Sequence, residues 1–126
     1  MANPNIKDTT TITLHTDFYK FTGSTPDQLV LENSASSGQV YKIDALSSVV
    51  DTGVVPNQLL IEYRSSGGTD YTLFEGLSAG GGKINIIDAT NPVYLMEGDS
   101  IRVTQDAGDP GFGAAADLVV RYQKIS

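Results

Sequence analysis

Apolar and polar residues alternate one by one through short segments of this chain, and this period of two restricts its fold more than any other feature. Successive side chains of a β-strand point to opposite faces, whereas a helix brings apolar residues together at spacings of three and four. No segment between capping residues shows the helical spacing over about three turns. Glycines and prolines, 13 and 5 in number, interrupt the alternating segments. Strands are therefore predicted over residues 10–14, 18–22, 29–32, 39–50, 59–64, 71–74, 83–88, 93–96, 101–104 and 118–125.

The number and spacing of these segments predict the fold class. Strands that follow one another every 8–12 residues or so are typical of a sandwich or a barrel, and strands with one polar face favour antiparallel pairing. We therefore expect an all-β protein, an antiparallel β-sandwich of about 8–10 strands with jelly-roll or Greek-key connections. A length of 126 residues with 40% hydrophobic content suits one core. The expected organisation is an N-terminal arm over residues 1–11 and a single β-sandwich domain over residues 12–126.

Two strands define faces clearly enough to predict which residues are buried. The last segment places Leu118, Val120 and Tyr122 on one face. In the 39–50 segment, one face is predicted to carry Tyr41, Ile43, Ala45 and Val49, and the other Lys42, Asp44 and Ser48.

Two glycine-containing segments predict tight turns. Residues 65–69, with two consecutive glycines, separate two apolar runs and indicate a hairpin. Residues 97–99 (Glu-Gly-Asp) indicate a second turn.

Composition excludes several classes of function. Eight Lys and Arg stand against 15 Asp and Glu, which gives a net charge of −7. Binding to nucleic acid or to an anionic membrane relies on clustered cations, so neither partner is expected. The absence of cysteine excludes disulfides, thiolate metal sites and a cysteine nucleophile. No apolar run approaches the roughly 20 residues of a membrane span, and the first residues lack the apolar centre of a signal peptide.

The single histidine is the first candidate for chemistry. His15 precedes Asp17 by two positions, so both would lie on one face of a strand, as a Ser-His-Asp triad would need. No Gly-x-Ser-x-Gly motif supplies the nucleophile, and one histidine cannot form a two-histidine zinc site. We expect His15 to be a histidine of a strand surface and predict no catalytic residue.

Two glycine-rich loops suggest ligand sites only in part. The glycines before Lys83 lack the spacing of a phosphate-binding loop and precede a strand. Asp106 and Asp109 lie in a glycine-rich loop that either binds calcium or is a plain loop tip. Neither sugar-cleaving carboxylates nor a small-molecule site is evident, and Tyr41, Tyr63, Tyr71 and Tyr122 are interpreted as core-edge residues with solvated hydroxyls. We expect no enzyme activity, cofactor, bound metal or small-molecule substrate.

Three segments resemble a known group of proteins. Residues 92–104 (PVYLMEGDSIRVT), 117–126 (DLVVRYQKIS) and 35–45 (ASSGQVYKIDA) are similar to small virion proteins of tailed bacteriophages. The resemblance implies a β-sandwich in the virion, and specifically a decoration (cement) protein that binds the major capsid protein on the outer head surface as a homotrimer and stabilises the capsid. A neck, tail or fibre protein and a carbohydrate-binding β-sandwich stay open as alternatives.

The polar N-terminal arm is the predicted contact surface. We hypothesise that the arm orders on a neighbouring subunit or on the capsid lattice and buries Ile6 and the adjoining Ile12. A frayed terminus is the alternative.

Overall fold

Strands make up most of the described part of the chain. The computed structural model describes residues 11–21, 28–50, 57–78, 83–105 and 116–126, and these residues form no helix. None of them, accordingly, forms a helix able to cross a membrane. The nine strands are β1 (Ile12–Phe21), β2 (Gln28–Glu32), β3 (Val40–Val50), β4 (Asn57–Arg64), β5 (Asp70–Ser78), β6 (Lys83–Ile87), β7 (Val93–Leu95), β8 (Ser100–Gln105) and β9 (Ala116–Ile125).

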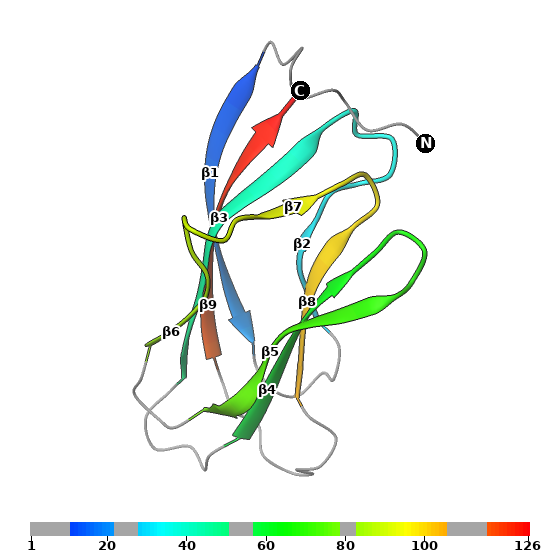
Figure 1. The fold of residues 1–126 in the computed structure, drawn as a ribbon. Helices are drawn as coiled ribbons and strands as arrows, with labels where there is room; N and C mark the ends of the chain where they lie inside the picture. Colours follow the sequence, from blue (N-terminus) through cyan, green and yellow to red (C-terminus); the bar gives the residue numbers. More distant parts are fainter. Residues whose placement is uncertain (1–10, 22–27, 51–56, 79–82, 106–115) are drawn as a thin grey trace.

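The strands form two facing antiparallel sheets (Figure 1). One sheet has the order β1-β9-β3-β6, with β7 also paired to β3, and the other has the order β2-β8-β4-β5. These two interleaved orders are those of a jelly roll, in which strands that are distant in sequence become neighbours. The predicted all-β, antiparallel sandwich is confirmed. The division into an arm and a domain stays a prediction, because residues 1–10 lie outside the described part.

The first strand corrects the predicted strand boundaries. Residues 10–14 and 18–22 were expected to form two strands, but a single strand runs from Ile12 to Phe21 and pairs with β9 without a shift in register. The polar residues between the two predicted strands hold the backbone extended through contacts with β9. His15 stacks on Tyr122, and the hydroxyl of Tyr122 donates a hydrogen bond to Asp17. The predicted break was wrong because these contacts join segments that are distant in the sequence, and local patterns do not report them.

A β-bulge corrects the predicted faces of β3. The register with β9 shifts between Ile43 and Ala45, so that Asp44 is an extra residue. A bulge of one residue moves all later side chains to the opposite face. Leu46 is consequently fully buried, whereas Val49, predicted on the same face as Ile43, is 41% exposed.

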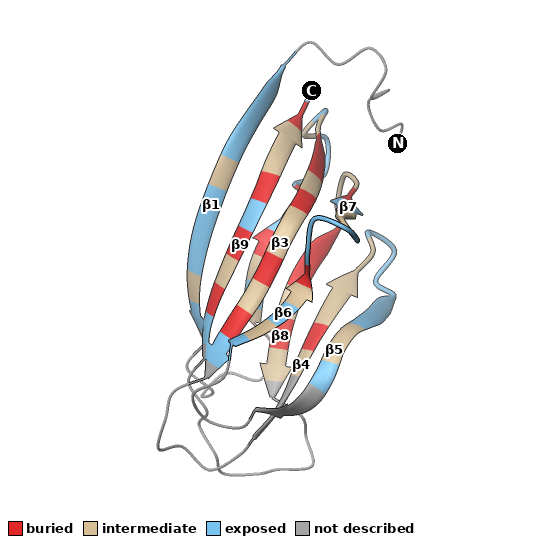
Figure 2. Ribbon diagram, turned by 60° about the vertical axis from the view of Figure 1, so that its left-hand side comes forward, coloured by how far each residue is buried: buried red, intermediate tan, exposed pale blue. Residues whose placement is uncertain are grey.

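The core lies between the two sheets, and in β9 it takes the face predicted from the sequence. Figure 2 shows buried positions alternating along β9 and β3. The core cluster consists of Leu31, Tyr41, Ile43, Leu46, Ile61, Ile87, Leu95, Ile101, Val103, Leu118, Val120 and Tyr122.

A buried carboxylate organises one end of the sandwich. Asp99 is 6% exposed, and its Oδ1 accepts a hydrogen bond from the backbone N–H of Ser66 (2.9 Å). Its Oδ2 accepts from the Met96 N–H (3.0 Å) and from the hydroxyl of Tyr63. Because Ser66 lies in the β4–β5 hairpin and Met96 follows β7, one side chain connects segments of both sheets. Burial without such partners would strongly destabilise the carboxylate.

Asn33 extends this network to the turn after β2. Its Nδ2 donates to the carbonyl oxygens of Gln39 (2.8 Å) and Leu95 (2.9 Å), and its backbone N–H donates to the carbonyl of Asp99 (3.0 Å). The N–H of Gly98 donates to the carbonyl of Asn33 (2.7 Å). The predicted turn at residues 97–99 is therefore built into a buried polar cluster.

Gly98 is the position in this turn that another residue cannot fill without strain. Its φ is +87°, and a Cβ added there would lie 2.7 Å from the Cβ of Ser66. We expect Gly98→Ala to lower the free energy of unfolding by about 2 kcal/mol, from left-handed backbone strain and steric overlap. Chemical denaturation measures this loss. The matched control is Gly68→Ala, where φ is +88° but nothing lies within 4 Å of the added Cβ. Equal losses in the two variants would contradict the role given to Ser66.

Candidate assembly surface

One face of β1 carries large apolar side chains that the rest of the chain leaves exposed. Ile12, Leu14 and Phe18 are 54%, 78% and 79% exposed, and together they are here called the β1 stripe. Alternate residues of a strand share a face, so the stripe lies on one side of β1 with Thr16 between Leu14 and Phe18. Figure 2 shows β1 exposed over most of its length at the edge of its sheet. Among the strands described, β1 pairs only with β9. This combination of an apolar face and a free edge is the candidate functional surface.

The opposite face of β1 attaches the strand to the sandwich. The rings of His15 and Tyr122 stack with centroids 5.1 Å apart, and the Tyr122 hydroxyl donates to Asp17 Oδ2 at 2.7 Å. At the other end of the strand, the Tyr19 hydroxyl donates to Gln28 of the second sheet. These contacts fix the position of β1 without using the stripe.

The structure does not place His15 in a triad. His15 and Asp17 share a face, as the alternation predicts, but the bonds formed by each lead elsewhere. His15 Nε2 lies 2.9 Å from the hydroxyl oxygen of Thr13, and Asp17 accepts from Tyr122. The stacked ring and the bonded carboxylate serve to hold β1.

Two tyrosines predicted to have solvated hydroxyls instead donate to carboxylates. Burial raises the pKa of Tyr63 well above its usual range, and the hydrogen bond to Asp99 raises it further. Burial likewise raises the pKa of Tyr122, with Asp17 as the hydrogen-bonded partner. In both pairs the neutral phenol is the form that the folded state stabilises.

These raised pKa values predict a loss of stability in alkali. An unfolded tyrosine ionises near pH 10, whereas Tyr63 and Tyr122 keep their protons to higher pH in the folded state. Their stabilising contribution is therefore fully present below about pH 10 and falls as the pH rises beyond it. Unfolding in urea at a series of pH values from 8 to about 11 would measure the slope. Tyr63→Phe and Tyr122→Phe should each flatten it, and a slope that neither variant alters would contradict the assignment.

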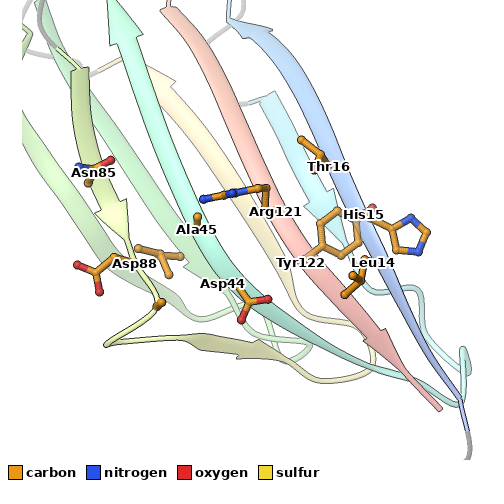
Figure 3. A pocket seen from close by; sticks show the side chains of 11 residues that line it. Leu14, His15, Thr16, Asp44, Ala45, Asn85, Asp88, Arg121 and Tyr122 are labelled. Carbon is orange, nitrogen blue, oxygen red and sulfur yellow. The ribbon is translucent and has the colours of Figure 1, made fainter.

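An open groove of about 490 Å³ lies beside the stripe on the outer face of the β1-β9-β3-β6 sheet. Figure 3 shows Arg121 extending from β9 over Ala45 of β3. Asp44 accepts from Gln123 Nε2 at 2.8 Å, and Lys42 Nζ lies 3.6 Å from its other oxygen. The groove is lined by both polar and apolar residues, with Leu14 of the stripe among them.

The other predicted sites have different outcomes. Ile12 belongs to the exposed stripe, whereas Ile6 lies outside the described residues. The proposed calcium ligands Asp106 and Asp109 also lie outside them. Within the described ranges, no group of three or more His, Cys, Asp or Glu residues could hold a metal ion.

The sequence interpretation missed Leu14 and Phe18 as surface residues. It assigned them to separate strands and so did not place them on one face. The available signal was the period of two through Ile12, Leu14, Thr16 and Phe18, which continues across the predicted break.

The fold defines a class, a small jelly-roll β-sandwich, and two solved structures share it. A subunit of Bacillus endospore appendages, described as a novel family of disulfide-linked pili, matches with a TM-score of 0.58 and 14% identity over 99% of this chain and 96% of that one. The core of Drosophila NLP, whose structure was related to pentamer formation and histone binding, matches with a TM-score of 0.51 and 8% identity over 90% and 98%. No protein-family model and no curated protein matches the sequence. At these identities the likeness concerns the fold alone.

Proposed function

We propose that this protein is a non-enzymatic structural subunit of a multi-subunit particle, and specifically a decoration protein on the head of a tailed bacteriophage. The observation that carries the proposal is the β1 stripe, in which three large apolar side chains are more than half exposed on a strand with a free edge. Fully burying one such side chain contributes roughly 1.5–3 kcal/mol, so contact with a partner protein would be strongly favourable.

The use of the titratable residues supports a structural role. His15 and Asp17 fix β1 to β9, and Asp99 joins two turns. Side chains that could act as a base or an acid are in this way bonded to phenols and backbone amides. A subunit that must stay folded on a particle surface needs such internal contacts.

The pilus protein supports the proposal in kind, since a chain of similar fold is described as forming disulfide-linked pili. This chain has no cysteine, so its own contacts with neighbours would be non-covalent. Such contacts depend on buried apolar area and on strand pairing, and β1 offers both.

The resemblance to phage virion proteins is the reason for proposing a phage head as the particle. Of the segments that carry it, residues 92–104 contain β7, nearly all of β8 and the turn with Gly98 and Asp99, and residues 117–126 contain nearly all of β9. A net charge of −7 suits a protein that faces outward, away from the packaged genome.

Electron microscopy of virions labelled with an antibody against the purified chain tests the location. The expected result is label on the head. Label confined to the neck, tail or fibres would overturn the decoration role and keep the structural one, whereas absence from the particle would overturn both.

Binding to heads stripped of this protein tests the surface. Leu14→Thr and Phe18→Thr should each weaken binding by at least about tenfold, through loss of apolar contact. Tyr71→Thr is the matched control, because Tyr71 is 56% exposed on β5, in the other sheet. Equal binding by all three variants would contradict the role of the stripe.

A further inference from the structure

β1 differs from the strands at the other edges of the two sheets, which are β2, β5 and, beside β3, both β6 and the three-residue β7. β6, β2 and β5 each contain an extra residue against their neighbour, at Ile86, Val30 and Leu73 respectively. Such bulges twist an edge and prevent it from pairing with another strand. β1 runs for ten residues in unbroken register with β9 and contains no proline. In the described structure it is the edge best suited to accept a further strand.

We propose that β1 pairs antiparallel with β1 of a second copy of this chain, with Thr16 of both strands on the twofold axis. The proposal deepens the proposed function by naming a partner and a register. In this arrangement residue i faces residue 32 − i of the other copy, so the contact spans residues 12–20. The two β1-β9-β3-β6 sheets become one continuous sheet.

The outer face matches itself in this register. Leu14 faces Phe18 of the partner subunit, and Phe18 faces the partner subunit's Leu14, which brings the most exposed residues of both stripes together. Thr16 faces its own equivalent between these two apolar pairs. Directly opposed apolar pairs and Thr–Thr pairs stabilise a sheet, so these central pairs are favourable, and Ile12 lies opposite Lys20 at each end.

The inner face places an imidazole opposite a carboxylate. His15 faces Asp17 of the partner subunit, and the reciprocal pair forms on the other side of the axis. Asp17 Oδ2 accepts from Tyr122, and Oδ1 is the second acceptor oxygen of this carboxylate. A shift of two residues either way would place His15 or Asp17 opposite its own equivalent and would separate Leu14 from Phe18. Both faces therefore select the same register.

This contact closes on itself. A twofold pairing uses the same surface on both subunits and leaves no β1 edge for a third copy. It therefore builds a dimer, and the trimer implied by the phage resemblance would need a different surface.

A single introduced cysteine tests the register, because the chain has none of its own. Thr16→Cys would place two thiols directly opposite each other, within the Cα separation that a disulfide needs. Two copies of Ile12→Cys would hold their thiols about 26 Å apart, eight residues along the strand. Thr16→Cys should form disulfide-linked dimers at least about tenfold faster than Ile12→Cys, and an equimolar mixture of Ile12→Cys and Lys20→Cys should form the mixed dimer. Comparable rates for the two single variants would overturn the register.

Charge substitutions test the pairing by solution mass. The unmodified chain should be a dimer at about 100 µM, and Leu14→Lys/Phe18→Lys should be a monomer with the same melting temperature. Leu14→Glu/Phe18→Lys places opposite charges at each opposed pair and should restore dimers. A trimer, or a monomer in the unmodified chain, would overturn the proposal. A monomer that still binds phage heads would overturn only the β1 pairing. A crosslinked dimer that is absent from virions would overturn only the proposed location on a phage particle.

Discussion

Asp99→Ala is expected to lower the free energy of unfolding by about 3–5 kcal/mol. The substitution leaves the N–H groups of Ser66 and Met96 and the hydroxyl of Tyr63 without their acceptor. Each unsatisfied polar group in a buried position costs about 1–3 kcal/mol, and partial entry of water limits the sum. Unfolding in urea, followed by tyrosine fluorescence, measures the change.

Asp88→Ala is the matched control for this prediction. Asp88 also accepts several hydrogen bonds, from the N–H and hydroxyl of Thr90 and from the N–H of Asn91, but it lies exposed in a turn. Water can replace an exposed acceptor, so we expect a loss of about 1 kcal/mol or less. Equal losses for Asp99→Ala and Asp88→Ala would mean that burial does not account for the stabilisation by Asp99.

Leu46→Ala is expected to lower the free energy of unfolding by about 3–4 kcal/mol. Leu46 is fully buried in the core, and its truncation removes apolar contact and leaves a cavity between the sheets. The midpoint and slope of a urea titration measure the loss, and an unchanged slope would show that the change lies in stability.

Val49→Ala tests the bulge at Asp44 that directs Leu46 inward. Without the bulge, Val49 would share the buried face of Ile43; with it, Val49 is 41% exposed. The expected loss is below about 1 kcal/mol. A larger effect for Val49→Ala than for Leu46→Ala would mean that the strand runs in the unbulged register.

Local patterns were sufficient to predict the fold class and most strands. The last strand and its buried face, with Val120 at its centre, follow from alternation alone. The hairpin at residues 65–69 and the turn at Gly98 follow from residues that tolerate positive φ. These features depend on neighbours in sequence, so a single sequence carries them.

The candidate surface was predicted only in part. Ile12 was expected to contact a partner, but Leu14 and Phe18 were not, because polar residues between them were interpreted as a break between strands. Contacts with Tyr122, more than a hundred residues away, keep this segment extended. No local pattern reports a contact at that separation.

The sequence by itself predicted an all-β antiparallel fold, which the described residues show, and it excluded cysteine chemistry. The period of two, the turn residues and the composition are local or additive properties. Only the tertiary structure decided that β1 lies at an edge, that bulges occur at the other edges and not in β1, and that Asp99 is buried. These depend on pairings such as that of Ile12 with Ile125, in which free energy is gained only after distant segments meet.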